Sequence, residues 1–192
     1  MVKRQWRAVR VCLLVWVFGL SAAGTVLAGE TWRVDHNKSR IGFIASYDSI
    51  EFPAVFERWQ GKFVFAPKRL AESKFDIVVD MGSVNTRSRD RDAGIRSEQW
   101  FDVKKFGNAQ YVTQRFGQRA DGTFEVDAEF RIKGISRPLK SIFTWTGDGN
   151  TRQLKGAVKV DRRTLQIGTG EWAQDPIIGF DVTITYDIVL QK

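Results

Sequence analysis

Apolar and polar side chains alternate with a period of two along most of this chain. Residues 123–133 read TFEVDAEFRIK, in which every second residue is apolar and the residues between them are mostly charged. Residues 180–190 repeat the pattern. Only a β-strand places alternate side chains on opposite faces. One face of each strand is therefore expected to be buried, and the other to face water.

Shorter stretches with the same alternation bring the expected number of strands to about eight. Turn signals such as Asp121-Gly122 and the Gly-Asp-Gly-Asn run at 147–150 separate them, which favours antiparallel neighbours. A single open sheet would leave its apolar face in water, so the set either closes into a barrel or splits into a sandwich. We predict an all-β fold, an eight-stranded antiparallel barrel. The shorter stretches are 41–47, 55–65, 73–80, 110–116, 139–145 and 154–160.

Residues 85–102 break this period and predict one short helix of two to three turns. Asn85 or Thr86 is the expected N-cap, and Asp92 and Arg96 are spaced for an i,i+4 ion pair. Such a charged helix is expected to plug one end of the barrel through Trp100 and Phe101.

The first 28 residues have the three parts of a secretory signal: a basic start, an apolar run and small residues before Ala28. We expect cleavage after Ala28, which leaves one domain over residues 29–192. A permanent membrane anchor is the alternative, although the apolar core of about ten residues is short for a span. The single cysteine, Cys12, lies in this segment, so no disulfide is expected in the mature protein.

Charge argues against a nucleic-acid partner. The net charge of +8 includes four basic residues of the signal. The mature chain would carry 26 basic and 22 acidic side chains, without the clustering that phosphate backbones require.

Few catalytic arrangements are open to the mature chain. It has no cysteine and one histidine, His36, so the usual Cys and His zinc sites and Cys-His catalysis are excluded. His36 is expected in a surface turn. Nothing in the sequence points to an enzyme, a metal or a catalytic cofactor. A hydrolase that uses acids near the helix stays open as an alternative, with Asp90, Asp92 and Glu98 as the acids.

Five motifs in order resemble the YceI-like family of exported polyisoprenoid-binding proteins. One of them, RDAGIRSEQWFDVKKFGNAQY at 91–111, is similar to the family's signature, an Arg-Asp-x-x-Leu-Arg-Ser helix followed by Phe-Phe-Asp-Val. The others are DHNKSRIGF at 35–43, WQGKFVFAP at 59–67, RIKGISRPL at 131–139 and DRRTLQIGTGEW at 161–172. Departures include Lys38-Ser39 for a His-Ser pair and Phe106-Gly107 for an aromatic-Pro pair.

The resemblance implies a lipocalin-like barrel in the periplasm that sequesters or transports a long isoprenoid lipid, of polyprenyl or quinone type, in an apolar tunnel without catalysis. The lipid would be cargo, and a transient redox partner in the inner membrane is a further expectation. The oligomeric state is left open. An integral outer-membrane barrel, with its apolar face outward, is the alternative.

Strand parity and helix position select the candidate binding residues. Arg91 and Arg96 on the helix are candidates for a polar head group. The candidates for the tail are the apolar residues of one strand face: Phe43, Phe63, Phe75, Ile77, Val79, Phe124, Val126, Phe130, Phe143, Trp145, Val158, Phe180, Ile184 and Tyr186.

Overall fold

The computed structural model describes residues 30–192, so the expected signal and its cleavage site after Ala28 lie outside the described residues. The strands are β1 (Thr31–Val34), β2 (Arg40–Tyr47), β3 (Ile50–Phe56), β4 (Trp59–Val64), β5 (Lys74–Asp80), β6 (Val84–Asn85), β7 (Asn108–Gln118), β8 (Phe124–Ile132), β9 (Ile135–Thr146), β10 (Thr151–Asp161) and β11 (Asp181–Gln191). The helices are α1 (Arg89–Arg96) and four short 3-10 helices, η1 (Leu70–Glu72), η2 (Met81–Ser83), η3 (Arg162–Leu165) and η4 (Gly170–Ala173).

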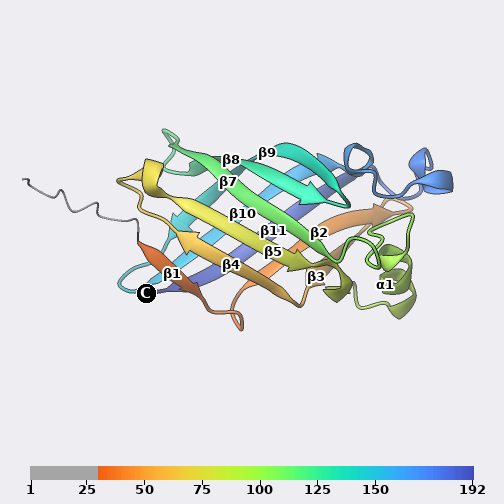
Figure 1. The fold of residues 1–192 in the computed structure, drawn as a ribbon, viewed down its shortest axis with the longest axis horizontal. Coiled ribbons are helices and arrows are strands. Elements are labelled where there is room, and N and C mark those ends of the chain that lie inside the picture. Colours follow the sequence, from red (N-terminus) through yellow and green to blue (C-terminus); the bar gives the residue numbers. More distant parts are fainter. Residues whose placement is uncertain (1–29) are drawn as a thin grey trace, which may run out of the picture.

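The strands form a closed antiparallel barrel (Figure 1). Eight positions close the ring in the order β1-β4-β5-β7-β8-β9-β10-β11, because β1 pairs with both β4 and β11. The predicted eight-stranded barrel with one short α-helix is thereby confirmed for the described residues.

Three barrel positions are each built from two shorter strands, and the third of them consists of β5, the partner of β4, and β6, the partner of β3. β2 continues β1 along the edge of β11, and β3 precedes β4 as the partner of β2. The β2–β3 hairpin turns at Asp48 and Ser49, which both have positive φ. Two residues of positive φ form the kind of tight turn that suits the right-handed twist of the two strands. The predicted single strand over 55–65 was wrong. Ser83 accepts hydrogen bonds from the backbone N–H groups of Glu57 and Arg58. The strand is interrupted at these two residues, between the end of β3 and the start of β4.

The barrel interior is filled by aromatic side chains at the end that holds β1 and the C-terminus. Phe65 is fully buried, and its ring contacts five other aromatic rings at centroid distances of 4.6–5.7 Å. Such edge-to-face and tilted contacts add to the hydrophobic gain from burial. We call this group the aromatic core; its rings include Phe63, Phe65, Phe75, Phe116, Phe124 and Phe143.

Charged side chains cover the outward face of the strands. Asp127 on β8 lies 2.7 Å from Arg115 Nη2 and 2.9 Å from Lys140 Nζ, with one partner on each neighbouring strand. An outer-membrane barrel carries an outward apolar band instead, so the direction of burial here is the opposite one. Within residues 30–192, no helix has the length and apolar content needed to cross a membrane.

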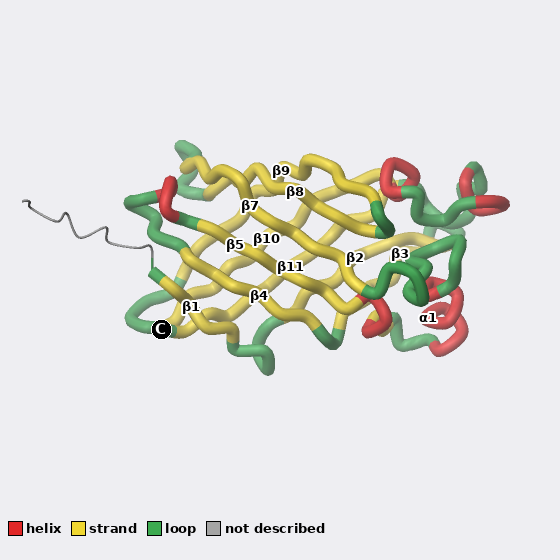
Figure 2. The backbone as a smooth tube through the Cα atoms, in the orientation of Figure 1, coloured by secondary structure: helices red, strands yellow, loops and turns green. Residues whose placement is uncertain are grey.

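Helix α1 lies at the other end of the barrel, together with η3 and η4 (Figure 2). Its N-cap is Ser88, whose hydroxyl accepts from Arg91 N, and the expected cap at Asn85 or Thr86 was wrong. The expected Asp92–Arg96 pair was also wrong. Asp92 instead accepts hydrogen bonds from the backbone and hydroxyl of Thr86, which lies in the preceding turn.

We expect Phe65→Ala to lower the free energy of unfolding by about 3–5 kcal/mol, because the cavity would remove contacts with five rings. Ile142→Thr, on the outward face of β9 where Ile142 is 42% exposed, is the control and should change it by less than about 0.5 kcal/mol. Urea unfolding of both variants measures the difference. Equal losses would contradict the assignment of Phe65 to the core.

Candidate functional site

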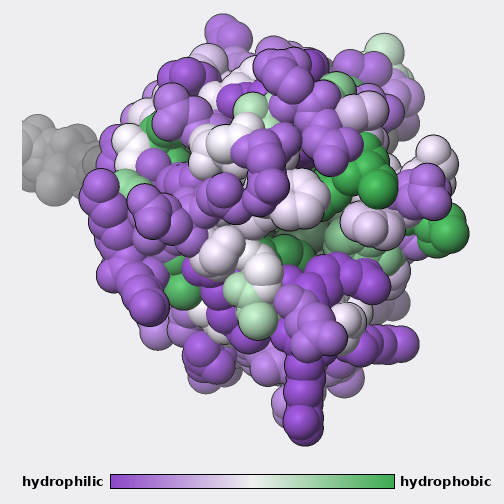
Figure 3. Space-filling view, turned by 90° about the vertical axis from the view of Figure 1, so that its right-hand side faces the viewer, coloured by the Kyte–Doolittle hydropathy of each residue, from purple (hydrophilic) through white to green (hydrophobic). Residues whose placement is uncertain are grey.

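The α1 end of the barrel is hollow. A pocket of about 450 Å³ opens there, within the size range of small-molecule sites. Seen from this end, apolar residues gather around a recess that is surrounded by polar ones (Figure 3). Tyr47, Ile50 and Ile177 lie close together at the β2–β3 turn, and their side chains are 52%, 72% and 36% exposed. This end therefore presents an apolar rim as well as an apolar interior.

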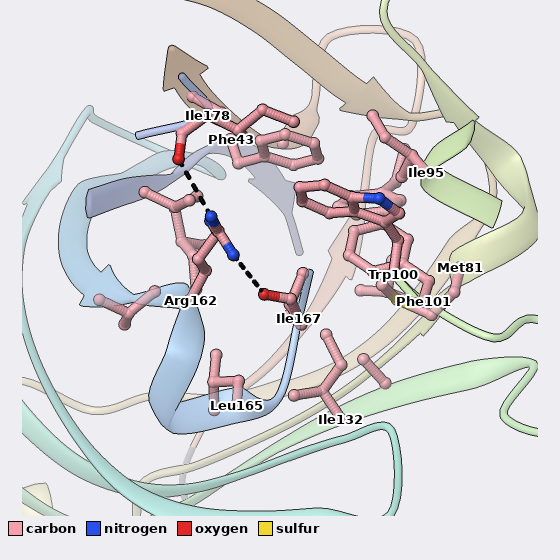
Figure 4. Close-up of a pocket in the computed structure, with 18 of the residues that line it drawn as sticks. Phe43, Met81, Ile95, Trp100, Phe101, Ile132, Arg162, Leu165, Ile167 and Ile178 are labelled. Atoms are coloured by element: carbon pink, nitrogen blue, oxygen red, sulfur yellow. Dashed lines mark hydrogen bonds between the residues drawn. The ribbon is translucent and has the colours of Figure 1, made fainter. Parts of the chain in front are cut away.

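Helix α1 and the residues that follow it form one side of the pocket. Ile95, Trp100 and Phe101 all line it (Figure 4). The Phe101 ring packs at 6.3 Å from Phe43 and 6.2 Å from Phe56, measured between centroids. The sequence predicted that Trp100 and Phe101 plug the barrel. They line its opening and leave the space behind them free.

The loop 166–180 forms the adjoining part of the wall, where Trp172 packs against Trp100, and the buried side chain of Arg162 fixes this loop. Arg162 is 1% exposed and donates only to backbone carbonyls, two of which are drawn in Figure 4. A planar guanidinium with five N–H groups suits this task because it can serve several acceptors at once. Burial lowers the pKa of Arg162, and the nearby carboxylate of Asp161 partly opposes this effect. The acceptors are the carbonyls of Ile167, Gly168, Trp172, Asp175, Ile178 and Gly179, at 2.8–3.4 Å.

The loop held by Arg162 contributes directly to the pocket wall. Ile167, Trp172 and Ile178 line the pocket, as does Leu165 in η3. Sequence reasoning missed all of these residues and Arg162. Their signal is weak, because apolar residues scattered through a glycine-containing loop have no period that assigns them to a face.

Four of the predicted tail residues line the pocket: Phe43, Val79, Phe130 and Ile184. The other ten do not. Two of them, Trp145 and Tyr186, pack against the buried cluster that contains the aromatic core. Six belong to that cluster: Phe63, Phe75, Ile77, Phe124, Val126 and Phe143. Val158 is half-buried on β10, and the ring of Phe180 lies under the guanidinium groups of Arg162 and Arg163. Contact with a ligand stays a prediction for every member of the set.

The two candidate head-group residues have different surroundings. The Arg91 guanidinium lies 4.0 Å from the centroid of the Phe52 ring, and both residues line the pocket. Its side chain donates no hydrogen bond to another described residue. Arg96 donates to the carbonyls of Gly82 and Val84, so its guanidinium is committed to the backbone. Of these two arginines, only Arg91 lines the pocket.

The remaining polar candidates lie outside the pocket lining. Asp92 is buried against Thr86, while Asp90 and Glu98 are exposed. His36 is in an exposed turn, as predicted, and its ring contacts Trp59. Among the described residues, no group of three His, Cys, Asp or Glu side chains is placed to hold a metal ion.

Two tyrosines lie on strands that also border the pocket, although neither of them lines it. Tyr111 and Tyr186 pack against the core, and their cross-strand partners Phe130 and Ile41 line the pocket. The Tyr186 hydroxyl lies 2.5 Å from that of Ser141. Burial raises the pKa of Tyr186 to about 12, although this hydrogen bond opposes the rise. Burial also raises the pKa of Tyr111.

Comparison with known proteins places this arrangement in context. Residues 32–190 match the model of the YceI-like domain. A UPF0312 protein of Vibrio parahaemolyticus is 28% identical over 95 residues, which make up 50% of this chain and 50% of the relative. The chain thus spans about half the length of that relative.

Two solved structures share the fold. BcnA of Burkholderia cenocepacia superposes with a TM-score of 0.79 at 22% identity, over 82% of this chain and 99% of BcnA. A polyisoprenoid binding domain from Saccharophagus degradans, implicated in plant cell wall breakdown, gives 0.66 at 14% identity, over 84% of this chain and 97% of that domain.

We expect the fold to lose stability in alkali through Tyr186. Its pKa of about 12 in the folded protein exceeds the ordinary value, so folding favours the neutral phenol. The stabilisation is complete below about pH 10 and is lost as the pH rises towards 12, by about 2–3 kcal/mol. Urea unfolding at pH 9 and pH 11.5 should show a smaller loss for Tyr186→Phe than for the parent protein. An equal loss would contradict the assignment.

Arg162→Lys should lower the free energy of unfolding by about 2–4 kcal/mol, since several buried carbonyls would lose their donors. Hydrogen exchange should also accelerate in residues 166–180. The control is Arg163→Lys, because Arg163 makes an exposed pair with Asp161 and should have a smaller effect. Unchanged exchange in this loop would count against the role given to Arg162.

Proposed function

The chain belongs to the YceI-like family, and on this premise we propose that it binds an isoprenoid lipid by enclosing the apolar tail in the pocket at the α1 end. The observation that carries the proposal is the lining of that pocket, in which apolar side chains from seven strands, α1 and the 166–180 loop face one space. Each methylene withdrawn from water contributes about 0.8 kcal/mol. The solved polyisoprenoid binding domain with the same fold supports this choice of ligand class.

The proposed activity is binding without chemistry. Among the described residues, the ionisable side chains that line the pocket are Tyr47, Arg91 and Arg162. Guanidinium groups stay protonated at neutral pH and do not exchange protons with a ligand. Tyr47 lies on the exposed rim, away from the interior. The site is therefore suited to hold a lipid and poorly suited to transform one.

Arg91 is the residue we assign to the head group. Its stacking on Phe52 holds the guanidinium beside the pocket. A phosphate or a quinone oxygen would accept charge-assisted hydrogen bonds there. The tail would then point into the barrel.

We place this activity in the periplasm, as sequestration or transport of a polyprenyl or quinone lipid. This part of the proposal rests on the secretory signal expected in residues 1–28. A quinone cargo would bring the protein to a redox partner in the inner membrane, which is the partner we propose.

The direct test is organic extraction of the protein purified from its native periplasm after osmotic shock, followed by mass spectrometry. We expect about one isoprenoid lipid per protein chain. Protein that is absent from the shock fluid would overturn the proposed location, and extracts free of lipid in repeated preparations would overturn the proposed ligand.

A substitution that fills the pocket should abolish binding without unfolding the barrel. Ala109 on β7 lines the pocket and is buried, so Ala109→Trp would place an indole in the ligand's space. We expect the affinity for a prenyl quinone to fall by a factor of about 100, equivalent to ~2.7 kcal/mol. The control is Ala157→Trp on the exposed face of β10, which should bind normally. Equal affinities of the two variants, both folded by circular dichroism, would place the ligand elsewhere.

A further inference from the structure

We propose that the apolar rim, formed by Tyr47, Ile50 and Ile177, inserts into the surface of a phospholipid bilayer and brings the mouth of the pocket to the lipid that the protein collects. This inference rests on the proposed function, because a lipid-binding pocket needs a route from the membrane. It adds the surface that makes the contact and the partner that this surface fits.

Exposed large apolar side chains concentrate at the α1 end of the barrel. Among the described residues, five such side chains are exposed, and three of them form the rim. The other two, Val78 and Ile142, lie on β5 and β9, which are not neighbours in the sheet. Tyr47 and Ile50 flank a two-residue turn, a place where polar residues are the rule. Apolar side chains gathered in this way mark an interaction surface.

Backbone hydrogen bonds hold the two segments of the rim together. The N–H of Asp48 donates to the carbonyl of Ile177 at 2.6 Å, and the N–H of Gly179 donates to the carbonyl of Ser46 at 3.0 Å. The carboxylate of Asp175 accepts from the N–H of Ile177 at 2.9 Å. The rim is therefore ordered before it meets a partner, and insertion does not have to order it.

The rim is continuous with the pocket. Tyr47 lines the pocket as well as the rim, and so does Ile178, which directly follows Ile177. Apolar side chains thus lead from the exposed turn to the recess (Figure 3). A tail that moves from a bilayer along this path would exchange one apolar surface for another. A protein or a second copy of the chain seated on the rim would instead cover the mouth.

The charges beside the rim balance one another. The hairpin carries the exposed acids Asp48 and Glu51, whereas α1 carries the exposed bases Arg89 and Arg91. Mixed charge of this kind gives an anionic bilayer no strong advantage over a neutral one. We therefore expect apolar insertion, and not electrostatic attraction, to hold the protein on the membrane. Tyrosine suits such a boundary because its ring is apolar and its hydroxyl can stay in water.

Vesicle flotation tests docking without any cargo. The protein purified from its native cells is mixed with vesicles of phosphatidylcholine, and in parallel with vesicles that also contain phosphatidylglycerol. We expect the protein to float with both. The bound fraction should change less than about twofold between about 0.1 M and about 1 M salt, because salt shortens the screening length from about 10 Å to about 3 Å but leaves apolar burial in place.

Two isoleucines of similar exposure supply a matched comparison. Ile177 in the rim is 36% exposed and Ile142 on β9 is 42% exposed, and neither lines the pocket. Ile177→Ser and Ile50→Ser should each lower the partition into vesicles at least about fivefold, because a buried isoleucine is replaced by a polar residue. Ile142→Ser should change it less than about twofold. Circular dichroism checks that all three variants are folded.

Binding of a short prenyl quinone in solution, without vesicles, separates docking from the proposed function. All three variants should bind it as the parent protein does. If they do, but the rim variants float as well as Ile142→Ser, the docking surface is wrong and the proposed function stands. A parent protein that floats but binds no quinone would overturn the proposed function.

The remaining outcomes identify another occupant of the rim. Flotation that is lost in high salt would overturn apolar insertion in favour of electrostatic attraction. A parent protein that stays off both kinds of vesicle would overturn the bilayer as partner. If that protein also sediments as a dimer that Ile50→Ser dissociates, the rim is a contact between two copies of the chain.

Discussion

The inward direction of apolar burial is the constraint on which the rest of the structure depends. Each strand turns one row of side chains inward, and the closed ring takes these rows out of water. Closure also pairs the strand edges with one another. The charged rows are left outside, where Asp127 and its basic neighbours join adjacent strands. The described residues contain no cysteine, so their stability rests on this burial and not on disulfides.

The two ends of the barrel use the same kind of row for different purposes. Near β1 the inward residues are large rings such as Phe65 and Phe75, which meet across the axis and fill it. Near α1 the wall includes the small residues Ala45 and Ala109, and an empty space is left between the strands. Helix α1 and the 166–180 loop stand around that space without filling it, so the hollow is a property of the side chains rather than of strand number.

The barrel could be predicted from the sequence because period-two alternation and hairpin turns are local signals. The site could be predicted only in part. Parity assigns Phe43 and Phe63 to the same face, but it does not tell that one borders the pocket and the other is packed in the core, because that depends on what lies across the barrel. The role of Arg162 was also out of reach, since its acceptors follow it within a loop that has no regular pattern.

The two arginines beside the pocket determine how a lipid would lie in it. All the donors of Arg162 are directed to carbonyls of its own loop, so it shapes the wall and has none left for a ligand. Arg91 is stacked on Phe52 at the opening, with its donors uncommitted among the described residues. Under the proposed function, a polar head group would meet Arg91 at the mouth, and the tail would lie inside the barrel.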